Sequence, residues 1–275
     1  MKIGLLQLNA GDDPVANLPV TLALIEDAVA EGVEFILTPE VTNCVSTSRS
    51  HQMQVLCHQT DDPTLTALRD AAAKHGIWLL IGSLALKTDD PDGRFANRCF
   101  LINPQGDIEA WYDKIHMFDV QISESESYRE SEGFRPGDRA VVADAGFAKI
   151  GLSICYDMRF PKLYRDLAHA GAQIITVPAA FSPITGAAHW ESLLRARAIE
   201  TGCFVIAPAQ TGKHKATAGK SRSTHGHSMV ISPWGEVILD AGNDHSMVCA
   251  EIDLDDVARA RQRVPSLTHD RPYTL

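Results

Sequence analysis

The sequence lacks any two cysteines close enough to form a Cys-x-x-Cys motif, although it contains six cysteines. Their spacing argues against a thiolate metal site or a thioredoxin-like redox pair. Cys99 and Cys203 stand inside apolar runs, where buried, reduced thiols of a cytoplasmic protein are expected. No apolar run approaches the ~20 residues that a membrane-spanning helix needs. Gln7 interrupts the apolar start of the chain and no small-residue cleavage site follows, so no secretory signal peptide is expected.

The chain also lacks an excess of positive charge. Its 25 Lys and Arg residues stand against 35 Asp and Glu residues, a net charge of −10, which argues against a general nucleic-acid surface. A small anionic substrate stays open, because a local arginine cluster can outweigh the mean field. No Pro-, Gly- or Ser-rich linker divides the 275 residues, so we expect a single domain over residues 1–275.

Short β-branched or aliphatic runs recur along the chain and predict strands. They cover residues 3–8, 35–38, 78–86, 99–102, 149–154, 174–177, 203–207, 228–231 and 247–252. Apolar stripes at helical spacing predict helices around residues 24–29, 65–75 and 190–198. A further helix is predicted over residues 162–169, because Pro161 suits the first position of a helix.

Two segments predict hairpin loops between neighbouring strands. They read Asn-Pro-Gln-Gly-Asp at residues 103–107 and Ser-Pro-Trp-Gly-Glu at residues 232–236, and Pro-x-Gly favours tight turns. Because hairpins are mixed with helical connections, the sequence predicts an α/β sandwich rather than a simple alternation of strands and helices.

Three side chains that follow strand-like runs form a candidate catalytic set: Glu40, Lys114 and Cys155. Ligands of open α/β sheets collect beyond the carboxyl ends of strands. A thiol needs a base to accept its proton and a cation to lower its pKa, and these residues supply both. The sharp turn after Cys155 would also aim the backbone N–H of Tyr156 at the same place, where it could bind an oxyanion.

Other patterns in the sequence lead to different sites, and each lacks something. Residues 214–221 resemble a phosphate-binding loop, but a histidine stands where the first glycine should be. His225 and His227 could lie on one strand face as metal ligands, yet no third ligand is evident. A dyad of Cys155 with His116 would resemble papain, but the local cysteine signature of that family is missing.

The three catalytic candidates stand in recognisable motifs: Glu40 in Leu-Thr-Pro-Glu, Lys114 in Tyr-Asp-Lys-Ile-His, and Cys155 in Ser-Ile-Cys-Tyr-Asp-Met-Arg-Phe-Pro. In this order the motifs resemble the nitrilase, or carbon–nitrogen hydrolase, superfamily over nearly the whole chain. The resemblance implies that Glu40 is the base, Lys114 the catalytic lysine, Cys155 the nucleophile and Glu130 a second catalytic carboxylate. It also implies a four-layer α-β-β-α sandwich, a homodimer or larger homo-oligomer, and catalysis without a cofactor or metal.

Within that superfamily, residues 184–201 are similar to the branch that hydrolyses deaminated glutathione. The resemblance implies a thiol-dependent amidase that cleaves the side-chain amide of a small α-keto acid, with neither nucleic acid nor a membrane as a partner. It suggests Arg159 for a substrate carboxylate, and Phe181 and Thr185 as pocket residues. The alternatives are an ω-amidase acting on 2-oxoglutaramate and an N-carbamoyl amino acid amidohydrolase. A non-enzymatic scaffold would have no need of the catalytic set.

A long polar segment, residues 212–227, is expected to be a functional loop, because such segments are uncommon inside compact domains. It offers Lys213 and Arg222 to the far end of a long substrate. Binding energy from remote groups can be used at the reacting carbonyl. We therefore expect these two residues to favour deaminated glutathione over 2-oxoglutaramate.

Overall fold

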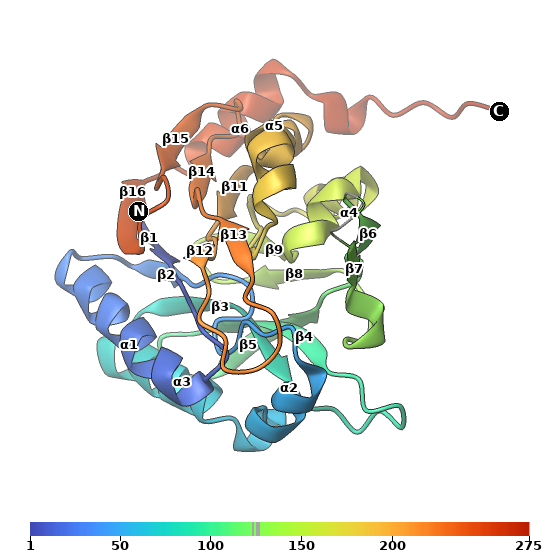
Figure 1. Ribbon diagram of the computed structural model, residues 1–275. Helices are drawn as coiled ribbons and strands as arrows, with labels where there is room; N and C mark the ends of the chain where they lie inside the picture. Colours follow the sequence, from blue (N-terminus) through green and yellow to red (C-terminus); the bar gives the residue numbers. More distant parts are fainter. Residues whose placement is uncertain (123, 125–126, 275) are drawn as a thin grey trace.

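The computed structural model describes residues 1–122, 124 and 127–274. Its centre is a pair of six-stranded sheets packed face to face (Figure 1). The first sheet has the order β16 (Ser246–Glu251), β1 (Lys2–Gln7), β2 (Phe35–Leu37), β3 (Trp78–Leu86), β4 (Ala96–Ile102), β5 (Ile108–Asp113). The second has the order β15 (Val237–Asp240), β14 (Met229–Ile231), β11 (Phe204–Ala207), β10 (Ile174–Thr176), β9 (Lys149–Leu152), β8 (Val141–Asp144).

Helices cover the outer face of each sheet. The first sheet is covered by α1 (Pro14–Ala30) and α3 (Pro63–His75), and the second by α4 (Pro161–His169) and α5 (Pro183–Thr201). The predicted four-layer α-β-β-α sandwich is therefore confirmed. Two shorter helices, α2 (Arg49–Val55) and α6 (Asp255–Arg263), were not expected from the sequence. Among the described residues, no helix has the length and apolar character needed to cross a bilayer.

Side-chain alternation along the strands builds two separate apolar layers. In β2, Phe35 and Leu37 point into the core between the sheets, whereas Ile36 points toward α1 and α3. In β3, Leu80 faces the first of these cores and Leu79 the second. Successive side chains of a strand point to opposite faces, and both faces here are covered. This explains why the strands are continuous apolar runs rather than alternating ones.

The centre of each sheet is parallel. Strands β1, β2 and β3 run parallel to one another, as do β9, β10 and β11. The carboxyl ends of β2 and β10 come close together at Gly82 of β3, where an added Cβ would lie 2.0 Å from the Thr38 carbonyl oxygen and 2.5 Å from Pro178. Only glycine allows this approach, which brings the loops after the two strands into one region.

The sequence predictions of secondary structure are confirmed for the main elements. Each of the nine predicted strands corresponds to a strand, and the four predicted helices are α1, α3, α4 and α5. Both Pro-x-Gly segments are hairpin loops, closed by hydrogen bonds of 3.0 Å from Asn103 N to Asp107 O and 2.9 Å from Ser232 N to Glu236 O. Two small ribbons were missed because their strands are short and polar: β6 (Asp119–Gln121) with β7 (Ser127–Arg129), and β12 (Thr211–Lys213) with β13 (Ser223–His225).

Candidate active site

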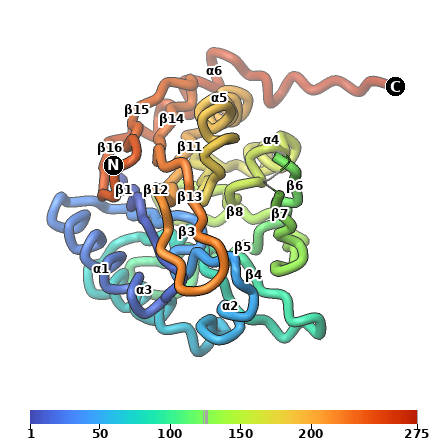
Figure 2. Tube along the Cα trace, in the orientation of Figure 1, coloured from blue at the N-terminus to red at the C-terminus, as the bar shows by residue number. Residues whose placement is uncertain are grey.

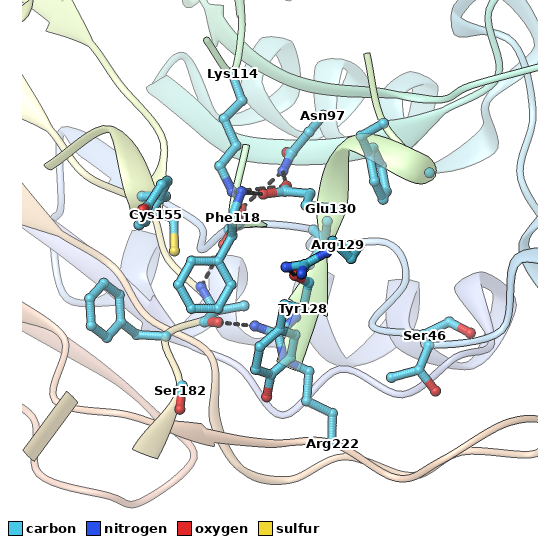
Figure 3. Close-up of a pocket in the computed structure, with 18 of the residues that line it drawn as sticks. Ser46, Asn97, Lys114, Phe118, Tyr128, Arg129, Glu130, Cys155, Ser182 and Arg222 are labelled. Carbon is cyan, nitrogen blue, oxygen red and sulfur yellow. Dashed lines mark hydrogen bonds and ion pairs between the residues drawn. The ribbon is translucent and has the colours of Figure 1, made fainter. Parts of the chain in front are cut away.

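The three residues of the predicted catalytic set and Glu130 come together in one cavity of about 230 Å³ (Figure 3). Glu40 follows β2, Lys114 follows β5 and Cys155 follows β9. Glu130 opens the short 3₁₀ helix η2 (Glu130–Glu132), which follows β7. Three strand ends and one ribbon end therefore supply one site, as the position of ligands in α/β sheets predicts.

The Lys114 ammonium lies at the centre of this site and is only 2% exposed. Its Nζ donates to Glu40 Oε1 at 2.8 Å and to both carboxylate oxygens of Glu130 at 2.9 Å. The amide of Asn97, on β4, donates to Glu40 at 2.9 Å and to Glu130 at 3.4 Å. Asn97 thus holds the two carboxylates together with the lysine. No sequence motif indicated Asn97. It reaches the site because its strand pairs with β5, and its carbonyl accepts a hydrogen bond from Lys114 N at 3.0 Å.

The Glu40 carboxylate lies beside the nucleophile. Its Oε2 accepts the backbone N–H of Ala180 at 2.8 Å, and it lines the same cavity as Cys155, close enough for each group to shift the pKa of the other. Glu40 is therefore fixed on one side by the lysine and on the other by a backbone donor. In this arrangement it can receive a proton from the sulfur without moving.

Electrostatics assign the resting protonation states. Burial alone would raise the pKa of Glu40, but the ammonium of Lys114 and the guanidinium of Arg222 outweigh it and hold that pKa below the usual value. Burial would likewise lower the pKa of Lys114, yet the carboxylates of Glu130 and Glu40 raise it. Burial and the Glu40 carboxylate raise the pKa of Cys155 well above the usual thiol value, and Lys114 opposes them only in part. The resting site therefore holds an ionised base, an ammonium and a neutral thiol.

A strained turn presents the nucleophile. Cys155 has φ +49°, in the left-handed region that non-glycine residues seldom adopt, and it opens the 3₁₀ helix η3 (Cys155–Arg159). Its backbone N–H donates to Pro178 O at 2.9 Å. Such outliers cluster at functional sites, where the surrounding structure holds them in place. The turn lets the sulfur face Glu40 while the chain continues away from the cavity.

The fully buried carboxylate of Asp157 connects this turn to the segment that carries the lysine. It accepts hydrogen bonds from Ile154 N at 2.9 Å, Tyr112 Oη at 2.7 Å and His116 N at 3.0 Å. The ring of His116 also bonds Asp157, at 2.7 Å through Nδ1, and does not line the catalytic cavity. His116 thus lies in the network that joins the two segments, and the papain-like alternative has no support from its position.

The remaining predicted site residues divide into two groups. Tyr156, Phe181 and Thr185 line the cavity. Arg159 does not: its guanidinium lies over the ring of Phe181 at 5.5 Å and bonds His189 Nδ1 at 3.2 Å. Its guanidinium packs on the rings of Tyr156 and Phe181, which themselves line the cavity.

Cations of other segments line the cavity instead, namely Arg49, Arg129 and Arg222. Arg222 comes from the polar segment that the sequence singled out, whereas Lys213 of the same segment is exposed and does not line the cavity. Arg49 and Arg129 were missed. Arg129 stands beside Glu130 in the sequence, which was the available signal, but nothing in the sequence placed α2 near the catalytic set.

The two histidines considered as metal ligands, His225 and His227, contact each other and a nearby aspartate. The rings of His225 and His227 stack with centroids 4.6 Å apart, and His227 Nδ1 bonds Asp240 Oδ1 at 2.9 Å. Within the part of the chain that the structure describes, no three His, Cys, Asp or Glu side chains are grouped so that they could hold a metal ion.

Comparisons with known proteins identify the family of the chain. A family model described as carbon–nitrogen hydrolase matches residues 2–262. A deaminated glutathione amidase of Yersinia enterocolitica is 37% identical over 98% of this chain and 93% of that protein. One of Synechocystis sp. is 39% identical over 96% of both chains. The crystal structure of the Caenorhabditis elegans NitFhit protein superposes with a TM-score of 0.89 at 36% identity, covering 98% of this chain and 65% of that one.

Replacing the nucleophile should abolish turnover without unfolding the protein. Cys155→Ala removes the nucleophile and should reduce kcat by at least about 10³-fold, because the catalytic groups act together and the loss of one disables the others. Alanine fits where the Cys155 side chain stands, so the melting temperature should stay close to that of the wild type. Cys57→Ala is the matched control, because this partly exposed free thiol does not line the cavity, and it should keep full activity. A Cys155→Ala variant with a few per cent of the wild-type rate would show that another group is the nucleophile.

The pH dependence of kcat/KM should report the assigned protonation states. Glu40 must be ionised to accept the thiol proton, so activity should fall only as the pH drops through its lowered pKa, below the usual glutamate value of 4.5. On the alkaline side no loss is expected up to pH 9.0, since the pKa values of Cys155 and Lys114 are both raised. Preincubation at each pH separates inactivation from titration. An acid limb centred near neutrality would identify a histidine, not Glu40, as the base.

Proposed function

The chain belongs to the carbon–nitrogen hydrolase family, and from this membership we propose that it hydrolyses deaminated glutathione to 2-oxoglutarate and Cys-Gly. Family membership makes it a hydrolase of carbon–nitrogen bonds other than peptide bonds. The observation that carries the proposal is one cavity that holds an ionised base, an ammonium and a neutral thiol in contact. The substrate is suggested by the names of the relatives that span nearly the whole chain.

In the first half of the reaction, Cys155 Sγ attacks the amide carbonyl while Glu40 takes the thiol proton. Lys114 and the backbone N–H of Tyr156 stabilise the oxyanion of the tetrahedral intermediate, and a single such donor contributes about 3–4 kcal/mol. The three N–H bonds of Lys114 face three carboxylate oxygens, two of them on Glu130. One of the two N–H bonds that face Glu130 can turn toward the oxyanion, and Lys114 then still keeps one hydrogen bond to each carboxylate. Glu40 then gives its proton to the departing nitrogen, and a 2-oxoglutaryl thioester remains.

In the second half, water replaces the amine. Glu40, ionised again, takes a proton from the water as its oxygen adds to the thioester carbonyl. Collapse of this intermediate breaks the C–S bond, and the proton held by Glu40 returns to the sulfur. The products are the carboxylic acid and the free thiol, so the cycle closes with no net change in the protein. Glu130 keeps Lys114 in place through both halves.

The cavity has the charge that a dianionic substrate requires. Its lining includes four cationic side chains and two carboxylates. The cavity therefore has a net charge of about +2, although the whole chain has a net charge of −10. Deaminated glutathione carries two carboxylates, whereas 2-oxoglutaramate carries one. Charge complementarity of this kind raises both association rate and affinity.

We therefore expect kcat/KM for deaminated glutathione to exceed that for 2-oxoglutaramate by at least about tenfold, a difference of ~1.4 kcal/mol and so the contribution of one charged contact. N-carbamoyl amino acids, which lack the 2-oxoglutaryl group, should be hydrolysed more slowly still. The measurement is the release of 2-oxoglutarate or ammonia from each substrate at equal concentrations. Equal values for the first two substrates would move the assignment to an ω-amidase and leave the amidase class intact.

We also propose that two copies of the chain associate through the layer formed by α5 and β15. β15 is an edge strand of its sheet, and the exposed apolar side chains of this region are Ile184, Ile199, Trp234, Val237 and Ile238. Light scattering should find a dimer or larger assembly, and Ile199→Glu should weaken it. Val15→Glu, at an even more exposed valine on α1, should not. A wild-type monomer at micromolar concentration would refute the proposal.

A cytoplasmic location is proposed from the cysteines. All six are free thiols, and disulfides form readily in oxidising compartments but seldom in the cytosol. Recovery of a tagged chain from the cytosolic fraction of its own cells tests this, and its recovery from an oxidising compartment would contradict it.

A further inference from the structure

Arg222 enters the catalytic cavity from a part of the fold that contributes nothing to the catalytic set. It lies at the end of the loop between β12 and β13, which extends from the second sheet across the carboxyl edge of the first, near α2 (Figures 1 and 2). Its guanidinium lies 5.7 Å from the ring of Tyr128 and donates through Nη2 to the carbonyl oxygen of Ala180. Figure 3 shows this bond on the side of the cavity opposite Lys114.

The loop that carries Arg222 is tied to the first sheet by specific contacts. Asp12 Oδ2 accepts from Thr217 N at 2.6 Å and from Thr217 Oγ1 at 2.9 Å. Thr47 exchanges two hydrogen bonds with the backbone of Lys220, at 2.9 and 3.0 Å. The carbonyl of Arg222 itself accepts from His214 N at 2.8 Å. These contacts pre-organise the arginine, so little entropy is lost when it binds a ligand.

The charge of Arg222 has no carboxylate partner in the described part of the chain. None of the ion pairs within 4.0 Å there includes it, its Nε is buried without a hydrogen-bond partner, and its one hydrogen bond goes to a neutral carbonyl. Lys114, Glu40 and Glu130 are paired with one another, so their charges are compensated within the catalytic set. A guanidinium with free donors facing a cavity suits an anion that it can bind through two parallel hydrogen bonds, and a carboxylate has that geometry.

The position of Arg222 relative to Glu40 indicates which substrate carboxylate it meets. Ala180 donates its N–H to Glu40 Oε2 and accepts from Arg222 through its carbonyl, so the arginine flanks the base on the side away from Lys114. Glu40 delivers the proton to the departing nitrogen, and a general acid must lie within hydrogen-bond distance of that atom. The leaving group therefore extends from the Glu40 side of the site, past Ala180 and toward Arg222. The oxyanion lies on the other side, at Lys114.

We propose that Arg222 is a specificity-determining residue that binds the terminal carboxylate of the leaving dipeptide. The inference rests on the proposed function, because it assumes the leaving group Cys-Gly. It explains how the enzyme can prefer a long amide over a primary amide with the same acyl group. The carboxylate of the leaving group reaches a cation that the acyl chain does not use.

The experiment compares three substrates: deaminated glutathione, the same molecule with its glycine carboxylate converted to a carboxamide, and 2-oxoglutaramate. In the wild type, kcat/KM for the acid should exceed that for the carboxamide by about tenfold, or ~1.4 kcal/mol. In Arg222→Gln this ratio should fall close to one, whatever happens to the overall rate, because effects on Glu40 act on both substrates and divide out of the ratio.

Two further variants sharpen the result. Arg222→Lys keeps the charge but loses the planar fork, so it should retain only part of the ratio. Lys213→Gln, on the same ribbon but outside the cavity, should keep the wild-type ratio. If Arg222→Gln does not fold, Arg222→Lys and the wild-type ratio still decide the question.

Each other outcome overturns the inference. A wild type that hydrolyses acid and carboxamide equally well has no subsite for that carboxylate. A ratio unchanged in Arg222→Gln shows that another residue binds it. Equal losses on all three substrates show that Arg222 acts through Glu40 or the acyl group, which all three reactions share, and not through the glycine carboxylate. If the wild type does not hydrolyse deaminated glutathione at all, the proposed function is refuted together with the inference. The other outcomes refute the inference about Arg222 alone.

Discussion

The Lys114 ammonium buried between Glu40 and Glu130 is the interaction on which the site and much of its surroundings depend. Transferring these charges out of water is costly, and their mutual attraction offsets the cost only when the geometry is good and the remaining polar atoms are bonded. Here the ammonium has three acceptors within 2.9 Å, and Asn97 donates to both carboxylates. Removing one partner would leave an uncompensated buried charge, so the ends of β2 and β5 and the start of η2 are held in one arrangement.

That same triad sets the chemistry. Its cation keeps Glu40 ionised, and burial together with the Glu40 carboxylate raises the pKa of the Cys155 thiol and keeps it neutral. The proton moves only when a carbonyl carbon is present to share the developing charge on sulfur, which protects the thiol from unproductive reaction. The base that takes this proton lines the same cavity as the sulfur, so we propose that it returns the proton to the leaving nitrogen. One carboxylate therefore serves as base and acid in turn without a second titrating group.

Much of the fold could be predicted because strand periodicity and turn chemistry are local properties. The continuous apolar run at residues 78–86 predicted β3, and the Pro-x-Gly segments predicted two hairpins. The ribbons β6–β7 and β12–β13 were not predicted, since their strands are three residues long and polar and depend on the tertiary contacts that hold them.

The motifs indicated the catalytic candidates and the polar segment indicated Arg222, but the sequence placed neither Arg159 outside the cavity nor Asn97 beside Lys114. Arg159 stands four residues from Cys155 in the sequence, yet its guanidinium packs on the ring of Phe181. Asn97 joins the triad only because β4 lies beside β5. Arg222 enters the cavity from a loop whose backbone N–H groups donate to distant Asp12, among them Ala218 N at 3.1 Å. Such positions follow from how the two sheets face each other, which no local pattern encodes.

The most direct test of the account is the ionisation of Cys155 in the resting enzyme, because the whole mechanism starts from a neutral thiol beside an ionised base. The difference in ultraviolet thiolate absorbance between the wild type and Cys155→Ala isolates this one sulfur from the other five. The account predicts no thiolate signal at neutral pH and none up to the usual thiol value of 9.0. A full thiolate signal at neutral pH would contradict it, since the sulfur would then be a preformed anion paired with Lys114 and Glu40 would have no proton to remove.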